Sequence, residues 1–182
     1  MPVYIVLLRA INVGAHKRMK MDKLLASCAA CGFAGAKTYI QSGNVVLKAP
    51  KIPPEKLSKK LEAQILTDFG FSAGVISRTK EDLGKIINNN PLLQERGVDP
   101  EKLHVVFLPE ATSPDAVKKL ESLTLAPDRV RMGEKDIYFY FPNGVSGSSL
   151  WKHPLDKVLK VSGTMRNWRT VTKLYEMAEG LE

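Results

Sequence analysis

The chain has 182 residues, of which 44% are hydrophobic and 25% are charged, and its formal net charge is +8. This length is enough for one large domain or two small ones with a hydrophobic core. No run of 18 or more apolar residues occurs, and no basic segment precedes the short apolar stretch near Met1, so neither a transmembrane helix nor a signal peptide is indicated. We therefore expect a cytoplasmic protein without a membrane partner.

The positive charge is concentrated in the first half of the sequence. Residues 1–90 contain 14 Lys or Arg against 6 Asp or Glu, whereas residues 91–182 contain 13 of each kind. An excess of positive charge favours anionic partners, although it also increases solubility. The sequence alone leaves both explanations open.

The first half predicts elements in the order β-α-β-β-α-β. Apolar and β-branched runs predict strands at 3–8, 36–40, 44–48 and 73–78, and helical periodicity predicts helices at 21–32 and from Pro53 to about residue 69. Gln41-Ser42-Gly43 separates the two middle strands as a hairpin turn. This order is that of a ferredoxin-like unit, an antiparallel sheet with both helices on one face.

The only two cysteines, Cys28 and Cys31, lie within the helix predicted at 21–32. Two cysteines cannot supply the four ligands of a structural zinc site. A redox pair usually has its first cysteine at a helix N-terminus, where the thiolate is stabilised, and here the pair lies in the middle of the helix. We therefore expect buried structural thiols in preference to a redox pair.

The second half repeats the order after a short helix at 80–90. A strand is predicted at 103–108, a helix at 113–123, a hairpin at 128–141 and two helices at about 149–160 and 164–179. The sequence therefore predicts an α+β fold of two ferredoxin-like (β-α-β-β-α) repeats with antiparallel sheets, plus C-terminal helices. The expected domains are a basic half at 1–90 and a second half at 91–182 that includes the terminal helices, with the turn-rich segment 88–100 as their junction.

A candidate site follows from this topology. Antiparallel connectivity places the loop at 9–20 and the turn at 41–44 at the same edge of the sheet. The loop leads into a helix N-terminus, which favours anions, and Gly14 permits an unusual backbone angle in it. We expect a polar, positively charged pocket, and the alternative is a basic loop beside an ordinary hairpin turn. Its candidate ligand-binding residues are Arg9, Asn12, Lys17, Lys20, Gln41, Ser42 and Asn44.

The segment GTMRNWRTVTKL at 163–174 extends the candidate site. It is predicted as the start of a helix with Thr164 as N-cap and Trp168 in the core. Arg166 would then lie in the first turn, where a cation opposes the helix dipole and a bound anion would remove the penalty. Asn167 and Arg169 complete this group of candidate ligand-binding residues. The alternative is that both arginines are solvated or ion-paired.

Tyr138 and Tyr140 alternate with apolar residues and therefore share one face of a strand. Paired aromatics on a ferredoxin-like sheet can stack RNA bases, but the glycine-rich RNA-binding pattern is absent, so a covered face is favoured. Phosphate-loop, dinucleotide, zinc and hydrolase motifs are also absent, and the three histidines are scattered. No cofactor or metal is expected, and no motif specifies a reaction.

The stretches LLRAINVG, TYIQSGNVV, NNNPLL, YFYFPNGV and TMRNWRTVTKL occur in this order. In these motifs the sequence closely resembles the Domain of Unknown Function 1697 family of mostly bacterial proteins, along essentially the whole chain. The resemblance implies a fold of two ferredoxin-like repeats and no established activity. Ala10 stands where the family pattern has glycine. The signature residues that the resemblance implies are Arg9, Asn12, Gly14, Gln41, Ser42, Gly43, Asn44, Arg166, Asn167 and Trp168.

Two hypotheses on function remain. The first is a binding module for an anionic ligand, either a nucleic acid or a nucleotide-like small molecule, held by the basic loop, the QSGN turn and the RNWR segment. The second is an enzyme acting on a phosphorylated or carboxylated metabolite, with Arg9 and Arg166 as charge clamps and His16 as the one obvious general base. The sequence indicates no oligomeric state.

Overall fold

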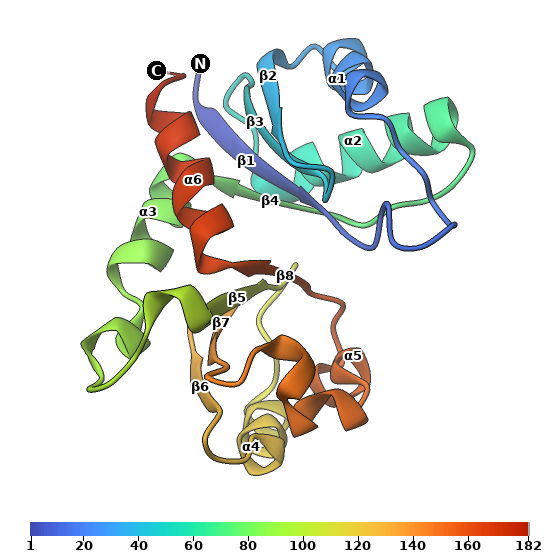
Figure 1. The fold of residues 1–182 in the computed structure, drawn as a ribbon. Helices are drawn as coiled ribbons and strands as arrows, with labels where there is room; N and C mark the ends of the chain where they lie inside the picture. Colours follow the sequence, from blue (N-terminus) through green and yellow to red (C-terminus); the bar gives the residue numbers. More distant parts are fainter. Residues whose placement is uncertain (182) are drawn as a thin grey trace. The chain divides into compact units, whose positions relative to one another are not determined.

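The computed structural model describes residues 1–181 and forms two compact units (Figure 1). The N-terminal unit comprises residues 1–85 and the segment from Thr172 onward, and the C-terminal unit comprises residues 86–171. The sequence placed both terminal helices in the second half, whereas the chain from Thr172 onward groups with the first. This grouping depends on contacts between segments that are far apart in the sequence, and local sequence patterns do not indicate such contacts.

The N-terminal unit contains one antiparallel sheet of order β2-β3-β1-β4. This is the ferredoxin-like order, so the first predicted repeat is confirmed. Its elements are β1 (Val3–Leu8), α1 (Met21–Ala30), β2 (Ala34–Tyr39), β3 (Asn44–Lys48), α2 (Pro54–Phe69), β4 (Val75–Thr79) and the first part of α3 (Lys80–Asn88).

Helices α1 and α2 cover one face of this sheet (Figure 1). Residues four apart on α2 are neighbours on one helix face, and Leu57, Leu61 and Ile65 are accordingly all fully buried there. Cys28 and Cys31 lie in the same core. Burial raises the pKa of the Cys28 thiol to about 12 and also raises the pKa of Cys31. The prediction of buried structural thiols is therefore confirmed.

The C-terminal unit repeats the topology with a sheet of order β6-β7-β5-β8. The α+β fold with two ferredoxin-like repeats is thereby confirmed, and the second repeat also has a fourth strand. Its elements are η1 (Pro91–Gln94), η2 (Pro100–Lys102), β5 (Leu103–Phe107), α4 (Pro114–Leu123), β6 (Arg129–Met132), β7 (Asp136–Tyr140), η3 (Val145–Gly147), η4 (Ser149–Lys152), α5 (Leu155–Leu159) and β8 (Thr164–Asn167); α6 (Trp168–Glu179) begins in this unit.

Strand β8 corrects the helix that the sequence predicted at 164–179. The first four residues of that range pair antiparallel with β5, with Arg166 opposite Val105, and the helix begins only at Trp168. Thr164 is therefore not the N-cap. Instead, the Asn167 side chain accepts a hydrogen bond of 2.8 Å from the backbone N–H of Thr170. A four-residue strand carries too little alternation to stand out beside a strong helical period, and its partner lies about sixty residues away.

The helix predicted at about 149–160 is also shorter than expected. It is divided into η4 and α5 at Pro154. Proline lacks the N–H that would continue a helix and restricts the residue before it to extended conformations. Helical structure therefore stops before Pro154 and restarts after it.

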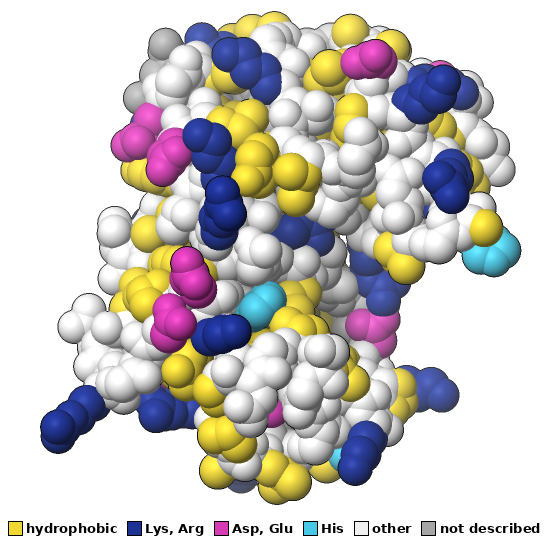
Figure 2. Space-filling model, in the orientation of Figure 1, with side chains coloured by type: hydrophobic (Ala, Val, Ile, Leu, Met, Phe, Trp, Pro, Cys, Tyr) yellow, Lys and Arg dark blue, Asp and Glu magenta, His cyan; other side chains and the backbone are white. Residues whose placement is uncertain are grey.

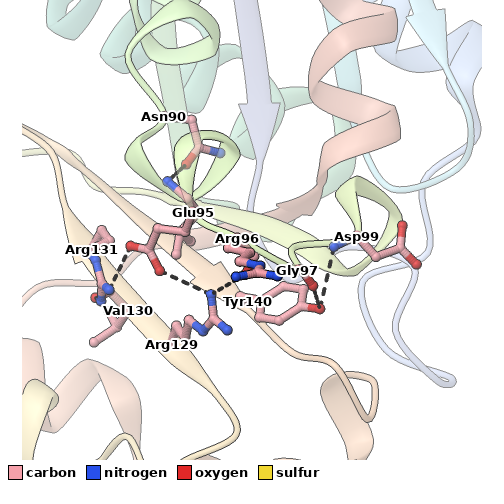
Figure 3. A network of polar contacts seen from close by, with 10 residues as sticks. Asn90, Glu95, Arg96, Gly97, Asp99, Arg129, Val130, Arg131 and Tyr140 are labelled. Carbon is pink, nitrogen blue, oxygen red and sulfur yellow. Dashed lines mark hydrogen bonds and ion pairs between the residues drawn. The ribbon is translucent and has the colours of Figure 1, made fainter.

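The tyrosine face of β7 is covered, as the sequence favoured. The Tyr138 hydroxyl donates a hydrogen bond of 3.1 Å to the carbonyl of Ile86, and the Tyr140 hydroxyl donates one of 3.3 Å to that of Gly97. Figure 3 shows Tyr140 beneath the segment at 95–99. Ion pairs of Glu95 with Arg129 and Arg131 join this segment to β6. Burial raises the pKa of Tyr138 to about 12. Neither ring is exposed for base stacking.

Candidate anion-binding site

The loop at 9–20 and the β2–β3 hairpin meet at one end of the N-terminal sheet. The backbone N–H of Leu8 donates to the carbonyl of Gly43 at 2.8 Å, and the Asn12 side-chain amide donates to the carbonyl of Gln41 at 2.8 Å. The N–H of Arg9 donates to the carbonyl of Gly74 at 2.8 Å, which adds the start of β4 to the same end. The predicted proximity of the two segments is confirmed.

Asn12 fixes the base of the loop. Its Nδ2 donates to the carbonyl of Met19 at 3.0 Å, its Oδ1 accepts from the N–H of Met19 at 2.7 Å, and its own N–H donates to the carbonyl of Lys17 at 3.1 Å. Ile11 and Met19, on either side, are each 3% exposed and belong to the core. The segment between them therefore projects from two anchored points, and Asn12 acts as the clamp of the loop.

The hairpin turn packs closely against this loop. A Cβ at Gly43 would lie 2.7 Å from both the Leu8 Cβ and the Ile11 Cδ1, and the φ of Gly43 is +78°. Only glycine tolerates this angle and this distance together. The space between turn and loop is therefore filled by side chains of the core.

The polar residues of the turn differ in their access to solvent. Asn44 is fully buried, and its Nδ2 donates to the Tyr39 carbonyl at 3.0 Å and to the Ser42 Oγ at 2.8 Å. Gln41 is exposed and Ser42 is half-buried. Asn44 therefore builds the turn, and Gln41 is the residue of the QSGN turn that faces solvent most.

Backbone strain gathers at the same end of the sheet. Ala10, Asn12, Lys17 and Ile40 all have φ between +49° and +53°, the left-handed region that residues with a Cβ rarely adopt. Such residues cost of order 1–3 kcal/mol each, persist only where their surroundings fix them, and cluster at functional sites. At Ala10, glycine would adopt this left-handed angle without steric strain.

The cations of the loop point to solvent. His16, Lys17, Arg18 and Lys20 are exposed and Arg9 is half-buried. Within residues 1–181, no ion pair involves Lys17, Arg18 or Lys20. Lys20 is the N-cap residue of α1 and makes no side-chain cap, so the helix start adds favourable potential for an anion. Figure 2 shows more Lys and Arg than Asp and Glu side chains on the visible face of the N-terminal unit.

The remaining candidates lie in the C-terminal unit. Arg166 is 8% exposed, and its Nη1 donates to the Thr164 Oγ1 at 2.7 Å and to the Met165 carbonyl at 2.8 Å. Burial lowers the pKa of Arg166 to about 10. Asn167 and Arg169 are exposed, and the Asn167 side chain caps α6. Arg166 therefore donates hydrogen bonds to residues of its own strand, β8. The prediction that it lies in the first turn of a helix is wrong.

Comparisons with known proteins place the chain in a family. A family model described as "Protein of unknown function (DUF1697)" matches residues 1–138. The chain belongs to this family. The matched range includes the loop and the hairpin of the candidate site and ends before the segment at 163–174. No curated protein matches the sequence.

Among solved structures, the DUF1697 chain is similar to the conserved bacterial protein SP0830 from Streptococcus pneumoniae. The two share 24% sequence identity with a TM-score of 0.78, and the match covers 97% of this chain and 98% of the other. At this identity the likeness shows a shared fold and no more.

Neither a metal-ligand cluster nor a membrane-spanning helix occurs within residues 1–181 of this DUF1697 protein. No cluster of three or more His, Cys, Asp or Glu side chains could hold a metal ion in that range. No helix there combines the length and the apolar character that crossing a bilayer requires.

Two features of the DUF1697 site gave no signal in the sequence. Ile40 reads as the end of a strand because β-branched residues favour strands, yet its backbone is left-handed and its side chain is 54% exposed. Gly74 joins the site only through its carbonyl, which every residue possesses. Both features depend on non-local packing.

Proposed function

We propose that the N-terminal unit binds an anionic ligand, and specifically single-stranded nucleic acid, through the loop at 9–20. The observation that carries the proposal is a set of exposed cations, Lys17, Arg18 and Lys20, on a loop that Asn12 holds in one shape. None of the three forms an ion pair within the described residues. Pre-positioned cations without protein partners favour a partner that brings negative charge.

The arrangement of these cations favours an extended polyanion over a small enclosed anion. All three are exposed on a projecting loop, so they can contact successive phosphates along a strand. Val13 and Ile40, which are 70% and 54% exposed, add apolar surface that a sugar or a base can cover. Single-stranded chains offer such groups beside each phosphate, whereas inorganic phosphate does not.

The candidate residues take different roles under this proposal. Lys17, Arg18 and Lys20 contact phosphates. Arg9, Gln41 and Ser42 contact the ligand at the base of the loop, and Asn12 and Asn44 hold the loop and the turn in shape. A contribution of Arg166, Asn167 and Arg169, which belong to the C-terminal unit, remains a prediction.

Fluorescence anisotropy with labelled single-stranded RNA and DNA tests the proposal across about 50 to 200 mM salt. The Lys17→Gln/Lys20→Gln variant should bind more weakly, and its log–log salt slope should be shallower by about 1.4, since each single-strand phosphate contact contributes about 0.7. The control is Lys56→Gln/Lys59→Gln, which removes equal charge from exposed positions at the start of α2, the opposite end of the sheet. Equal loss in both variants, or no binding at low salt, contradicts the proposal.

The same assay addresses the nucleotide-like ligand and the enzyme alternative. We would add a mononucleotide at the same phosphate concentration as the labelled strand. Effective competition at this concentration would favour a small-molecule site. The enzyme alternative relies on Arg9 and Arg166 as clamps and on His16 as base. Because Arg166 is buried in β8 and His16 is exposed on the loop, the structure favours the binding module over this alternative.

A further inference from the structure

The two repeats cover the helix-side faces of their sheets to different extents. In the first repeat, α2 has 16 residues and extends along the sheet. In the second repeat, the corresponding helix α5 has only 5 residues, because Pro154 separates it from η4. Figure 1 shows α4 and this short α5 on the same side of the second sheet. The second sheet therefore has less helix over this face than the first.

A pocket of about 220 Å³ occupies this part of the C-terminal unit. Val106 of β5 and Met165 of β8 line it on the sheet side. Between them in the lining, just before β8, a Cβ at Gly163 would lie 2.7 Å from the Val106 Cγ1, so position 163 has no room for a side chain. Six of its seven lining residues are uncharged, and only Asp156 carries a charge. The lining residues are Val106, Trp151, Leu155, Asp156, Leu159, Gly163 and Met165.

Trp151 forms a fixed wall of this pocket. Its indole N–H donates to the carbonyl of Val145, and its ring centroid lies 5.9 Å from that of Phe141. The side chain is 38% exposed. These two contacts hold the ring in place, and the part of the side chain that they leave uncovered lines the pocket.

We propose that this pocket binds a small single-ring aromatic molecule that is neutral or cationic. An engineered apolar cavity of about 150 Å³ accommodates benzene, so a pocket of this size can hold a ring with a short substituent. The Trp151 ring and the Met165 thioether are favourable partners for an aromatic face and edge. The carboxylate of Asp156 in the wall disfavours an anion. This site lies in the C-terminal unit and is independent of the proposed nucleic-acid site.

Thermal melting and tryptophan fluorescence with three matched probes test the proposal: benzylamine, benzyl alcohol and benzoate. At about ten times its dissociation constant, benzylamine or benzyl alcohol should raise the melting temperature by about 3–6 °C. Benzoate should bind about tenfold more weakly than benzylamine because of the Asp156 charge. Failure of all three probes to raise the melting temperature, or equal binding of benzoate and benzylamine, overturns the proposal.

Two variants locate the binding. Leu155→Phe extends a half-buried side chain at the rim into the pocket and should abolish the response to benzyl alcohol, whereas Leu125→Phe, at an exposed position outside the pocket, should retain it. Asp156→Asn should reduce the difference in affinity between benzylamine and benzoate, while benzyl alcohol should still raise the melting temperature. This variant tests the location even if Leu155→Phe does not fold. An unchanged preference in Asp156→Asn, or an unchanged response in a folded Leu155→Phe, overturns the proposed location.

Discussion

Ala10, Asn12, Lys17 and Ile40 show how single residues give the candidate site its shape. Each has a left-handed backbone without being glycine, and all four lie at one end of one sheet. Contacts of the core at Ile11 and the clamp by Asn12 hold these angles in place. Three of these four residues lie in the segment that carries the exposed cations, and Ile40 lies at the hairpin beside it.

Ala10→Gly should raise the free energy of unfolding by about 0.5–1 kcal/mol. The left-handed angle costs a residue with a Cβ about 1–2 kcal/mol, which exceeds the extra entropy that glycine loses on folding. Urea unfolding measures the change. The control Ala26→Gly, at an exposed position in α1, should lower stability by about 1 kcal/mol. A loss of stability in both variants would show that the angle at Ala10 is not strained.

We expect His104 to make the stability of the protein depend on pH near neutrality. Burial lowers the pKa of its imidazole, whose ring lies 5.5 Å from that of Phe141. A base whose pKa is lower in the folded state binds fewer protons there than in the unfolded chain, so stability falls as the pH drops below the unfolded pKa of about 6.5. His104→Gln should therefore lose less stability between about pH 7 and pH 5 than wild type. Melting curves at both pH values test this, and a loss in His104→Gln equal to that of wild type would contradict it.

At the scale of elements, β8 decides the roles of the segment that the sequence marked as an anion site. Pairing with β5 turns Thr164 and Arg166 toward one face of the sheet, where both are buried, and Asn167 becomes the cap of α6. Trp168, at the start of that helix, is 8% exposed, as its helical period predicted. A cation that the sequence placed at a helix end is therefore part of a strand.

Arg166→Gln should lower the free energy of unfolding by about 1–3 kcal/mol. The shorter side chain cannot reach both the Thr164 hydroxyl and the Met165 carbonyl, and a buried acceptor without a donor is costly. The exposed substitution Lys157→Gln should change stability by less than about 0.5 kcal/mol. Denaturant titration compares the two. A ligand-free Arg166→Gln protein as stable as wild type would restore the view of Arg166 as a surface ligand group.

At the scale of the whole molecule, the C-terminal end of the chain returns to the N-terminal unit. The Tyr175 ring lies 3.1 Å from the position that a Cβ at Gly84 would take. The Leu181 Cδ2 lies 3.6 Å from the position that a Cβ at Gly35 would take. Leu174 and Ala178 are buried as well. The first repeat is therefore completed by residues that follow the second.

Removal of the chain from Thr172 onward should destabilise the N-terminal unit by about 3–6 kcal/mol, since burial of each of Leu174 and Leu181 contributes about 1.5–3 kcal/mol. Hydrogen exchange of β1 to β4 amides in the truncated protein measures this loss. The control Lys173→Ala/Glu176→Ala removes an exposed ion pair of 3.2 Å and should change stability by less than about 1 kcal/mol. Unchanged exchange after truncation would show that the first repeat folds without its terminal segment.

The sequence by itself determined the repeated α+β organisation, the buried cysteines and the meeting of the loop at 9–20 with the hairpin. These features follow from local periodicity and from antiparallel connectivity, which short segments express directly. Only the tertiary structure decided that Arg166 belongs to a strand, that Asn44 is buried, that the backbone of Ile40 is left-handed and that Trp151 lines a pocket. Each of these depends on which distant segment packs against the residue, and a single sequence carries no local pattern for that choice.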